Sequence, residues 1–588
     1  MLRSAVLFLR RRILQSCLAN QPSFVVLFDR GRKASLLQTL RAGMDPAAVE
    51  KRPHEDEDVG TSQKRVKTME AMEKEEVNTP EEGSADAGEK PKKARDGFPK
   101  NLKNRKGKEK NSRNPTRDRR GTRNREAAEL ADAGEGDDEA SGEPKAPRLP
   151  KRMRALLIGF CGSGYKGMQI QQNAKTIENA LFDAMVRAGA VSQDNSDDPV
   201  KVGIHRAART DAGVHAAGNV VSLKMITNVP GVPDMTARIN EELPPEIRLW
   251  GHIRVQNSFN PRTYALCDSR KYTYFFPTYT LIPPKPSSAQ YRVLTEHAAS
   301  LTPAMPSPIV DHPFWADSGD DAADMARKRA WRIDPEQVAQ LRVTAKKYLG
   351  THNFHNFTVD GAFSDRSNQR YMKDMEIADP VVYGETEWIS VLFHGQSFMM
   401  HQIRKMMSIL VLSCRTGTPA QVIDELYGPR DVLIPKMPAL GLLLEEPLFD
   451  TYNLKVARAN EKVTPDHADY RPPITFEPHR EAMAAFKEKY VYDNMRRVED
   501  RDGLFDAWIR MVDAYGGNDL LYLNPKGTIP QAAVIKLRER HRKGGFKEKK
   551  LFDATSFPEA QQSLEAEEED EDEEAMEMNK RKRIDTEG

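Results

Sequence analysis

The chain has 588 residues, of which 39% are hydrophobic and 30% are charged, and its formal net charge is +2 at pH 7. This length exceeds the needs of one domain, and the composition indicates a folded core diluted by polar segments. The four cysteines are widely spaced and form no CxxC pair, which argues against a disulfide framework and favours a reducing compartment. No apolar run approaches the length of a membrane span, so we expect no membrane partner.

Residues 1–43 are basic, carry short apolar clusters and contain Asp29 as their single acidic residue. This composition is typical of a mitochondrial presequence, and equally of an unstructured basic leader or an unused upstream start. Met44 opens a segment of acidic character, so we expect initiation there to yield a second form without the leader.

Residues 44–150 lack a sustained apolar period and are predicted to be disordered. Lys51-Arg52 and Lys64-Arg65-Val66-Lys67, separated by an eleven-residue spacer, resemble a bipartite nuclear localisation signal. Between Lys92 and Arg125, fifteen basic residues against three acidic ones form a block that suits either phosphate attraction or a solvated linker.

The C-terminal segment 551–588 is predicted to be a disordered acidic tail, in which the run Glu565 to Glu574 precedes the basic cluster Lys580 to Arg583. Three basic clusters in disordered surroundings favour a nuclear address and recognition by the import machinery. The mitochondrion is the alternative or additional destination, through residues 1–43.

The segment 151–280 is predicted to be a first half of mixed α and β structure. The run 155–160 indicates a buried strand, and the apolar stripe of a helix follows Thr176, a typical N-cap. Between this helix and a strand at 219–223, Arg206 and Arg209 precede Asp211. Asp-Ala-Gly is ordinary turn chemistry. The flanking cations would nevertheless keep the Asp211 carboxylate ionised and attract a phosphodiester.

After the turn 259–262, the alternation of residues 270–276 predicts a strand with Tyr272 and Tyr274 on one face. Residues 281–330 are rich in proline and aspartate and are predicted to be an inserted loop region.

The segment 331–455 is predicted to be a second α/β half. Asp334 and Pro335 begin a helix that Gly350 ends, and a strand at 388–394 leads into another helix. On that helix Arg404 lies at the border of the apolar stripe, while Lys405 points into water. Residues 456–550 are predicted to be a helical extension that packs on the core or rests on a long nucleic acid.

Six motifs lie in order between about residues 153 and 455, and they are the stretches 162–169, 206–216, 259–262, 270–274, 353–357 and 398–407. Together they resemble the tRNA pseudouridine synthases of the A-type family, and within it the eukaryotic branch 1. The resemblance implies an α+β fold of two ferredoxin-like halves whose antiparallel sheets join across a central basic cleft. It also implies an enzyme that isomerises uridine to pseudouridine in tRNA without a cofactor.

By motif position, Asp211 matches the family's catalytic aspartate, which acts as nucleophile at C1′ or as base at C2′. Tyr272 matches the tyrosine that stacks on the uracil, and it is a plausible carrier of the C5 proton. Arg404 matches the basic residue that forms an ion pair with the aspartate. The predicted RNA contacts are Arg206, Arg209, His215, Arg262 and Gln169.

The expected substrates are uridines of the anticodon stem and of other tRNA sites, with messenger and small nuclear RNA as further candidates. The alternatives are an inactive RNA-binding or RNA-folding protein on the same scaffold, and the related branch that modifies the anticodon loop. No metal is expected in catalysis, and the scattered cysteines and histidines leave a structural zinc ion as an open alternative. The insertion and the C-terminal extension favour a monomer over the dimers of bacterial relatives.

Overall fold

The computed structural model describes residues 149–171, 173–263, 266–310, 312–317, 319–536 and 544–553. The predicted presequence, the start at Met44, the nuclear signals, the basic block and the terminal acidic and basic runs lie outside these residues. In the described ranges, no helix combines the length and the apolar character needed to cross a membrane.

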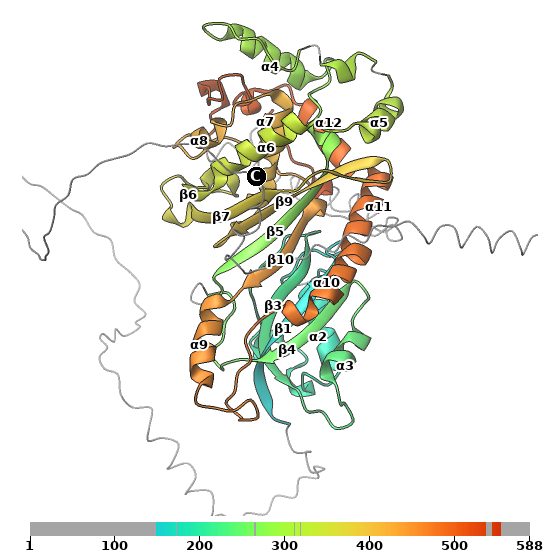
Figure 1. Ribbon diagram of the computed structural model, residues 1–588, viewed down its shortest axis with the longest axis vertical. Helices are drawn as coiled ribbons and strands as arrows, with labels where there is room; N and C mark the ends of the chain where they lie inside the picture. Colours follow the sequence, from blue (N-terminus) through green and yellow to red (C-terminus); the bar gives the residue numbers. More distant parts are fainter. Residues whose placement is uncertain are drawn as a thin grey trace, which may run out of the picture. The chain divides into compact units, whose positions relative to one another are not determined.

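One sheet of ten strands forms the centre of the described structure (Figure 1). The strand order is β4-β1-β3-β10-β5-β9-β7-β6, and β2 and β8 pair with β3 and β9. Only β3 and β10 pair in parallel; the other pairs are antiparallel. The strands are β1 Lys151–Phe160, β2 His205–Arg206, β3 His215–Ile226, β4 Ile247–Arg254, β5 Ser269–Pro277, β6 Gly350–Asn353, β7 Gln369–Ile377, β8 Val381–Tyr383, β9 Thr386–Gly395 and β10 Leu442–Leu448.

The mixed fold with a mostly antiparallel sheet agrees with the α+β expectation at this coarse level. The sheet is continuous, because β10 from the second half inserts between β3 and β5 of the first half. Leu443 and Leu444 of β10 pair with the first residues of β3, and they pair with Thr273 and Tyr272 of β5 on the other side. Because β10 pairs with both strands, the start of β5 lies near the loop that precedes β3.

Two helices begin at the N-cap residues that the sequence predicts. The Thr176 side chain accepts a hydrogen bond from the Asn179 backbone N–H at 3.3 Å, and Asp334 caps the next predicted helix in the same manner. Both predicted caps are therefore confirmed. The helices are α2 Ile177–Arg187, α3 Met235–Glu242, α4 Ala289–Ser300, α5 Asp321–Ala330, α6 Pro335–Ala345, α7 Gln402–Thr416, α8 Val422–Leu426, α9 Asp450–Asn460, α10 Arg480–Phe486, α11 Asp493–Asp502 and α12 Leu504–Asp513.

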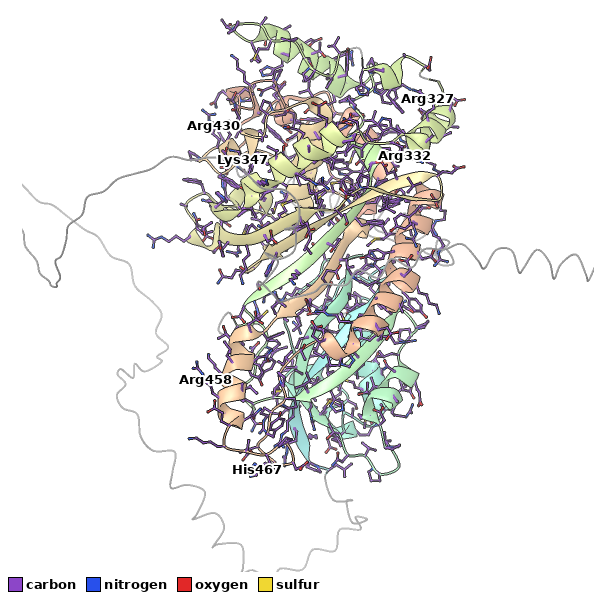
Figure 2. The ribbon with its side chains drawn as sticks, in the orientation of Figure 1. Arg327, Arg332, Lys347, Arg430, Arg458 and His467 are labelled. Atoms are coloured by element: carbon purple, nitrogen blue, oxygen red, sulfur yellow. The ribbon has the colours of Figure 1, made fainter. Side chains whose placement is uncertain are left out.

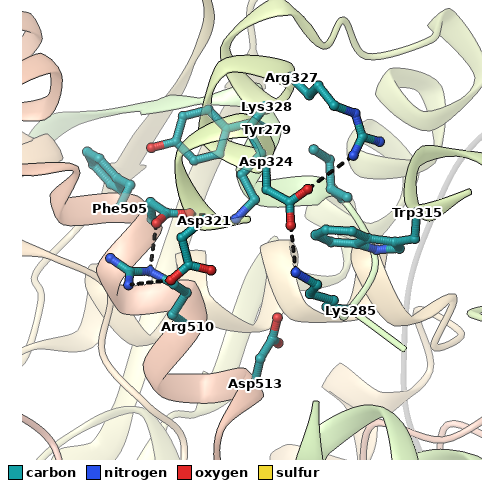
Figure 3. A network of polar contacts seen from close by, with 12 residues as sticks. Tyr279, Lys285, Trp315, Asp321, Asp324, Arg327, Lys328, Phe505, Arg510 and Asp513 are labelled. Carbon is teal, nitrogen blue, oxygen red and sulfur yellow. Dashed lines mark hydrogen bonds and ion pairs between the residues drawn. The ribbon is translucent and has the colours of Figure 1, made fainter. Parts of the chain in front are cut away.

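The insertion 281–330 is not the predicted loop region, because it contains α4 and α5. Its turn-forming residues delimit helices instead: the side chains of Ser288 and Asp320 cap α4 and α5. The carboxylate of Asp324, on α5, lies between Lys285 at 2.6 Å and Arg327 at 3.1 Å (Figure 3). The Asp324–Lys285 pair connects α5 to the segment that precedes α4, whereas the Asp324–Arg327 pair lies within α5.

The C-terminal extension packs on the core, and Figure 1 shows α10 and α11 alongside the sheet. Phe486 of α10 meets Trp250 of β4 edge to face, with ring centroids 5.5 Å apart. The guanidinium of Arg415, on α7, donates to both carboxylate oxygens of Asp513 at 2.6 and 3.0 Å. Because this pair is buried and bidentate, removing one partner would leave an uncompensated charge in the core.

Candidate active site

A cavity of about 480 Å³ lies where the loop before β3 meets the start of β5 and the beginning of α7. Its volume falls in the range of pockets that hold a small organic ligand. It is lined by Arg206, Ala207, Ala208, Arg209, Thr210, Asp211, Val214, Arg262, Arg270, Tyr272, Ser397, Phe398, Met399, Met400, His401, Gln402, Ile403 and Leu442. Residues of four of the sequence motifs thus meet at one cavity, close to where β10 inserts between β3 and β5.

Asp211 lies on the tight loop between β2 and β3, where its carbonyl accepts a hydrogen bond from the Val214 N–H at 3.2 Å. Gly213 completes this turn with φ +73°, a conformation that favours glycine. A Cβ atom on Gly162 would lie 2.1 Å from the Val214 carbonyl oxygen, so the glycine lets the loop after β1 support the Asp211 loop. The turn interpretation of Asp211 is therefore confirmed, and it places the residue in the cavity wall.

The Asp211 carboxylate is 28% exposed, and several charges surround it. Burial raises its pKa above the ordinary value of an aspartate, and Asp553 raises it further. Arg404 and Lys436 oppose these effects, because each stabilises the carboxylate form. The Asp211 pKa is therefore set by burial and the Asp553 charge on one side and by the Arg404 and Lys436 charges on the other.

Arg404 is fully buried on α7, rather than at a solvent border as its helical position predicts. Its Nε donates to the Met437 carbonyl at 2.6 Å, and its Nη2 donates to the Phe552 carbonyl at 3.0 Å. The same Nη2 lies 2.8 Å from Oδ1 of Asp553. Residues 434–438 and 544–553 cover the helix here, which is why the side chain cannot reach solvent.

The predicted ion pair between Arg404 and Asp211 is not formed in this arrangement, in which Asp553 takes the carboxylate's place on the guanidinium. The charge of Arg404 still lowers the pKa of Asp211. The prediction for Lys405 is also wrong, because its Nζ donates to the Thr358 carbonyl at 3.1 Å instead of lying free in water. The helical pattern around Lys405 could not predict this contact, because Thr358 belongs to a separate segment that packs beside α7.

Tyr272 lies on β5 on the cavity wall and is only 7% exposed. Its ring meets Phe398 edge to face with centroids 5.2 Å apart, a contact that typically adds about 0.5–1.5 kcal/mol beyond burial. Burial raises the Tyr272 pKa above its ordinary value, and Asp211 adds to this effect. The phenol is therefore protonated at neutral pH and is better suited to contact a flat ring than to remove a proton.

Basic side chains line the cavity from several elements. Arg206 forms a hydrogen-bonded ion pair with the buried carboxylate of Glu178 on α2, whereas Arg209 and Arg262 are exposed at the cavity. Arg270 is buried and donates to the Gln396 carbonyl at 2.9 Å and to the Ala207 carbonyl at 3.0 Å. Fixed guanidinium groups beside an open cavity suit phosphate or nucleotide binding.

A sequence profile of the tRNA pseudouridine synthase family matches residues 344–450. The tRNA pseudouridine synthase 1 of Eremothecium gossypii is 40% identical over 410 residues, covering 63% of this chain and 74% of the relative. The Saccharomyces cerevisiae protein of the same name is 39% identical, covering 63% and 72%. That of Schizosaccharomyces pombe is 36% identical, covering 64% and 86%. The chain belongs to the tRNA pseudouridine synthase family.

In this synthase, the predicted RNA contacts His215 and Gln169 do not line the cavity. His215 is fully buried: its Nδ1 accepts from the Gly162 N–H at 3.0 Å, and its Nε2 lies 3.0 Å from the Leu440 carbonyl. Burial lowers the His215 pKa to about 4, so the ring is neutral and connects β3 to two loops. Gln169 is partly exposed on the loop after β1, outside the residues that line the cavity.

Sequence reasoning missed four residues at the site of this synthase: Arg270, His401, Lys436 and Asp553. Arg270 and His401 fall inside quoted motifs, so their position beside Tyr272 and Arg404 was a usable signal. Lys436 and Asp553 lie in no motif, and only the fold brings them to Arg404. In the part of the synthase that the structure describes, no cluster of three or more His, Cys, Asp or Glu residues could hold a metal ion.

Proposed function

We propose that this protein isomerises specific uridines of tRNA to pseudouridine. The observation that carries the proposal is the placement of Asp211, Tyr272 and several arginines around one cavity in a member of the tRNA pseudouridine synthase family. The relatives named tRNA pseudouridine synthase 1 support tRNA as the substrate class. An RNA-binding protein without chemistry would not need a carboxylate in the cavity wall whose pKa is raised by burial and lowered by the Arg404 and Lys436 charges.

The reaction breaks the N1–C1′ bond of uridine and forms a C5–C1′ bond; C5 loses a proton and N1 gains one. In one route the Asp211 carboxylate attacks C1′ and is later displaced by C5. In the other route it removes the C2′ proton as the N1–C1′ bond breaks, which gives a glycal; C5 then bonds to C1′ while the protonated Asp211 returns the proton to C2′. Both routes need the ionised carboxylate, and the Arg404 and Lys436 charges favour that form.

The target base must leave its stack before it can enter the cavity, at a cost of about a few kcal/mol. Tyr272 and Phe398 supply aromatic surface for the flipped uracil, and Arg209 and Arg262 lie where phosphates would be held. Because the Tyr272 pKa is raised, stacking is its principal role in this proposal. Arg206 contributes chiefly by its ion pair with Glu178, which holds the Asp211 loop to α2.

The finer parts of the proposal concern architecture, substrates and location. We infer two ferredoxin-like halves that meet at the parallel β3–β10 pair, with the RNA cleft across that junction. The anticodon stem of tRNA is the first expected target, with messenger and small nuclear RNA as further ones. The insertion and the C-terminal extension favour a monomer. The basic clusters favour action in the nucleus, with residues 1–43 directing a second form to mitochondria.

Pseudouridine mapping of total RNA from cells with and without the protein tests this function. Loss of pseudouridine at defined tRNA stem positions in the deletion, restored by the wild-type chain and not by Asp211→Asn, is the expected result. Loss confined to the anticodon loop would favour the related branch. Unchanged pseudouridine in all RNA, together with retained RNA binding by the purified chain, would leave only the RNA-binding alternative.

A further inference from the structure

The segment 544–553 approaches the active site from the far end of the described chain. Phe546 and Phe552 are 5% and 2% exposed, so apolar burial anchors the segment at both ends. The Phe546 N–H donates to Oδ2 of Asp519 at 3.0 Å, and the Phe546 ring packs on Tyr515 with centroids 5.3 Å apart. The segment is therefore held in place by contacts that do not involve the catalytic cavity.

Asp553, at the end of this segment, lies between two cations beside the cavity. Its carboxylate is 2.8 Å from Nη2 of Arg404 and 2.6 Å from Nζ of Lys436. Glu548 reinforces the arrangement by accepting the Lys436 backbone N–H at 2.8 Å and by lying 3.5 Å from its Nζ. The segment thus brings negative charge to cations that would otherwise be buried together.

Only two of the three guanidinium nitrogens of Arg404 have a partner among the described residues. Nε donates to the Met437 carbonyl, and Nη2 contacts Phe552 and Asp553. Nη1 makes no hydrogen bond to any residue that the structure describes, although the side chain is fully buried. A buried guanidinium donor normally has an acceptor, so Nη1 is the Arg404 donor left to bond the Asp211 carboxylate, on which the Arg404 charge already acts.

We infer that Asp553 is a positioning residue for the reaction: it fixes the Arg404 guanidinium so that Nη1 remains available to the reacting carboxylate. This inference rests on the proposed function, because it assigns a part of the same site. Asp553 acts through Arg404 and does not line the cavity itself. The first residues of the segment 551–588 therefore have a role at the site, although the sequence predicts this segment to be disordered; they include the buried Phe552.

The electrostatics lead to a second consequence. The charged groups that act on the Asp211 pKa are Arg404, Asp553 and Lys436, and the titratable side chains of His401 and Tyr272 also neighbour the carboxylate. Of these, only Asp553 adds negative charge, and it raises the Asp211 pKa. Removing that charge should lower the Asp211 pKa and shift the acid limb of the activity profile to lower pH.

The test compares Asp553→Asn and Asp553→Glu with Asp513→Asn in the full chain, using kcat, KM for tRNA and the pH dependence of kcat. Asp513→Asn is the matched control. Asp513 pairs with Arg415, which lies on α7 as Arg404 does, but Asp513 is not among the residues that line the cavity. We expect Asp553→Asn to lower kcat about tenfold to hundredfold, since small displacements of a positioned group have effects of this size. Its KM should change little, and its acid limb should move to lower pH.

Asp553→Glu keeps the charge but displaces the guanidinium, so kcat should fall while the acid limb stays in place. If Asp553→Asn does not fold, this variant decides the question: reduced kcat at wild-type stability supports the inference, and wild-type kcat overturns it. Wild-type kcat and an unchanged profile in folded Asp553→Asn also overturn it, as does an equal loss of kcat in Asp513→Asn. A wild-type chain that forms no pseudouridine would instead refute the proposed function.

Discussion

Nε2 of His401 lies 3.8 Å from Oδ2 of Asp211, yet the two residues do not form an ionic pair at neutral pH. Burial lowers the His401 pKa to about 3, and the charges of Arg404 and Lys436 add to this effect. His401 precedes α7 with φ +61°, so its backbone adopts a left-handed conformation to begin the helix. The imidazole therefore contributes shape and a neutral polar edge to the cavity.

We expect the His401 imidazole to stay neutral between about pH 5 and 8, where an unperturbed histidine would titrate. Imidazole NMR of the wild-type chain, assigned with His401→Gln, would show no shift of this resonance in that interval. Free histidine in the same buffer serves as the control, because an unperturbed imidazole has a pKa of about 6.5. A titration of His401 near pH 6.5 would contradict the electrostatic environment described above.

Replacement of Asp211 by asparagine should abolish pseudouridine formation, because neither route can proceed without a carboxylate. The amide is nearly isosteric, so the loop and the binding of tRNA should be retained. Turnover and tRNA affinity, measured on the same purified variant, separate the two effects. Substantial residual turnover would refute the assignment of Asp211 as the reacting group.

Arg404→Lys should lower activity steeply although it keeps a positive charge. A lysine cannot span the Met437 carbonyl, the Phe552 carbonyl and Asp553 as the planar guanidinium does. Arg415→Lys on the same helix is the control: it should lower the free energy of unfolding, because its bidentate pair with Asp513 is lost, without a specific effect on kcat. Near-normal kcat in Arg404→Lys would show that the reaction does not need the planar guanidinium group of Arg404.

Arg209→Gln and Arg262→Gln should each weaken tRNA binding and reduce the salt dependence of affinity by about one phosphate contact. Both arginines are exposed and line the cavity. Arg458 on α9 is an exposed arginine outside the cavity lining, labelled in Figure 2, and Arg458→Gln is the matched control. Equal changes of the salt slope in all three variants would indicate a general effect of charge rather than specific contacts.

Glu499 should make the stability of the protein fall as pH rises. Its pKa is raised to about 8, chiefly by burial, whereas an exposed glutamate has a pKa of about 4.3. The unfolded chain loses the proton first, so the stabilising contribution is complete below about pH 4.3 and is lost as pH rises toward 8. The free energy of unfolding should fall by at most about 1.4 kcal/mol per pH unit in this window.

Glu499→Gln should remove this dependence, because the amide resembles the protonated carboxyl that accepts the Phe505 N–H. Denaturant unfolding at several pH values measures the difference between wild type and variant. Glu481, exposed on α10, is the control position, and Glu481→Gln should follow the wild-type pH dependence. A wild-type slope in Glu499→Gln would show that other groups cause the change.

Local patterns in the sequence determined much of the fold. Thr176 and Asp334 begin helices as predicted, because capping involves only backbone groups a few residues away. Tyr272 and Tyr274 share one face of β5, because alternation is a property of any strand. The Asp211 turn is equally local. Motif order added the family, which the comparisons confirm.

The tertiary structure alone decided which groups meet. Arg404 faces Asp553, more than a hundred residues later in the chain, and His215 is sealed between two loops instead of facing RNA. Helical periodicity describes the faces of a helix but not the segments that cover them, so Arg404 at the border of the apolar stripe is fully buried. Partners that are distant in sequence are chosen by the path of the whole chain, and no local pattern encodes that path.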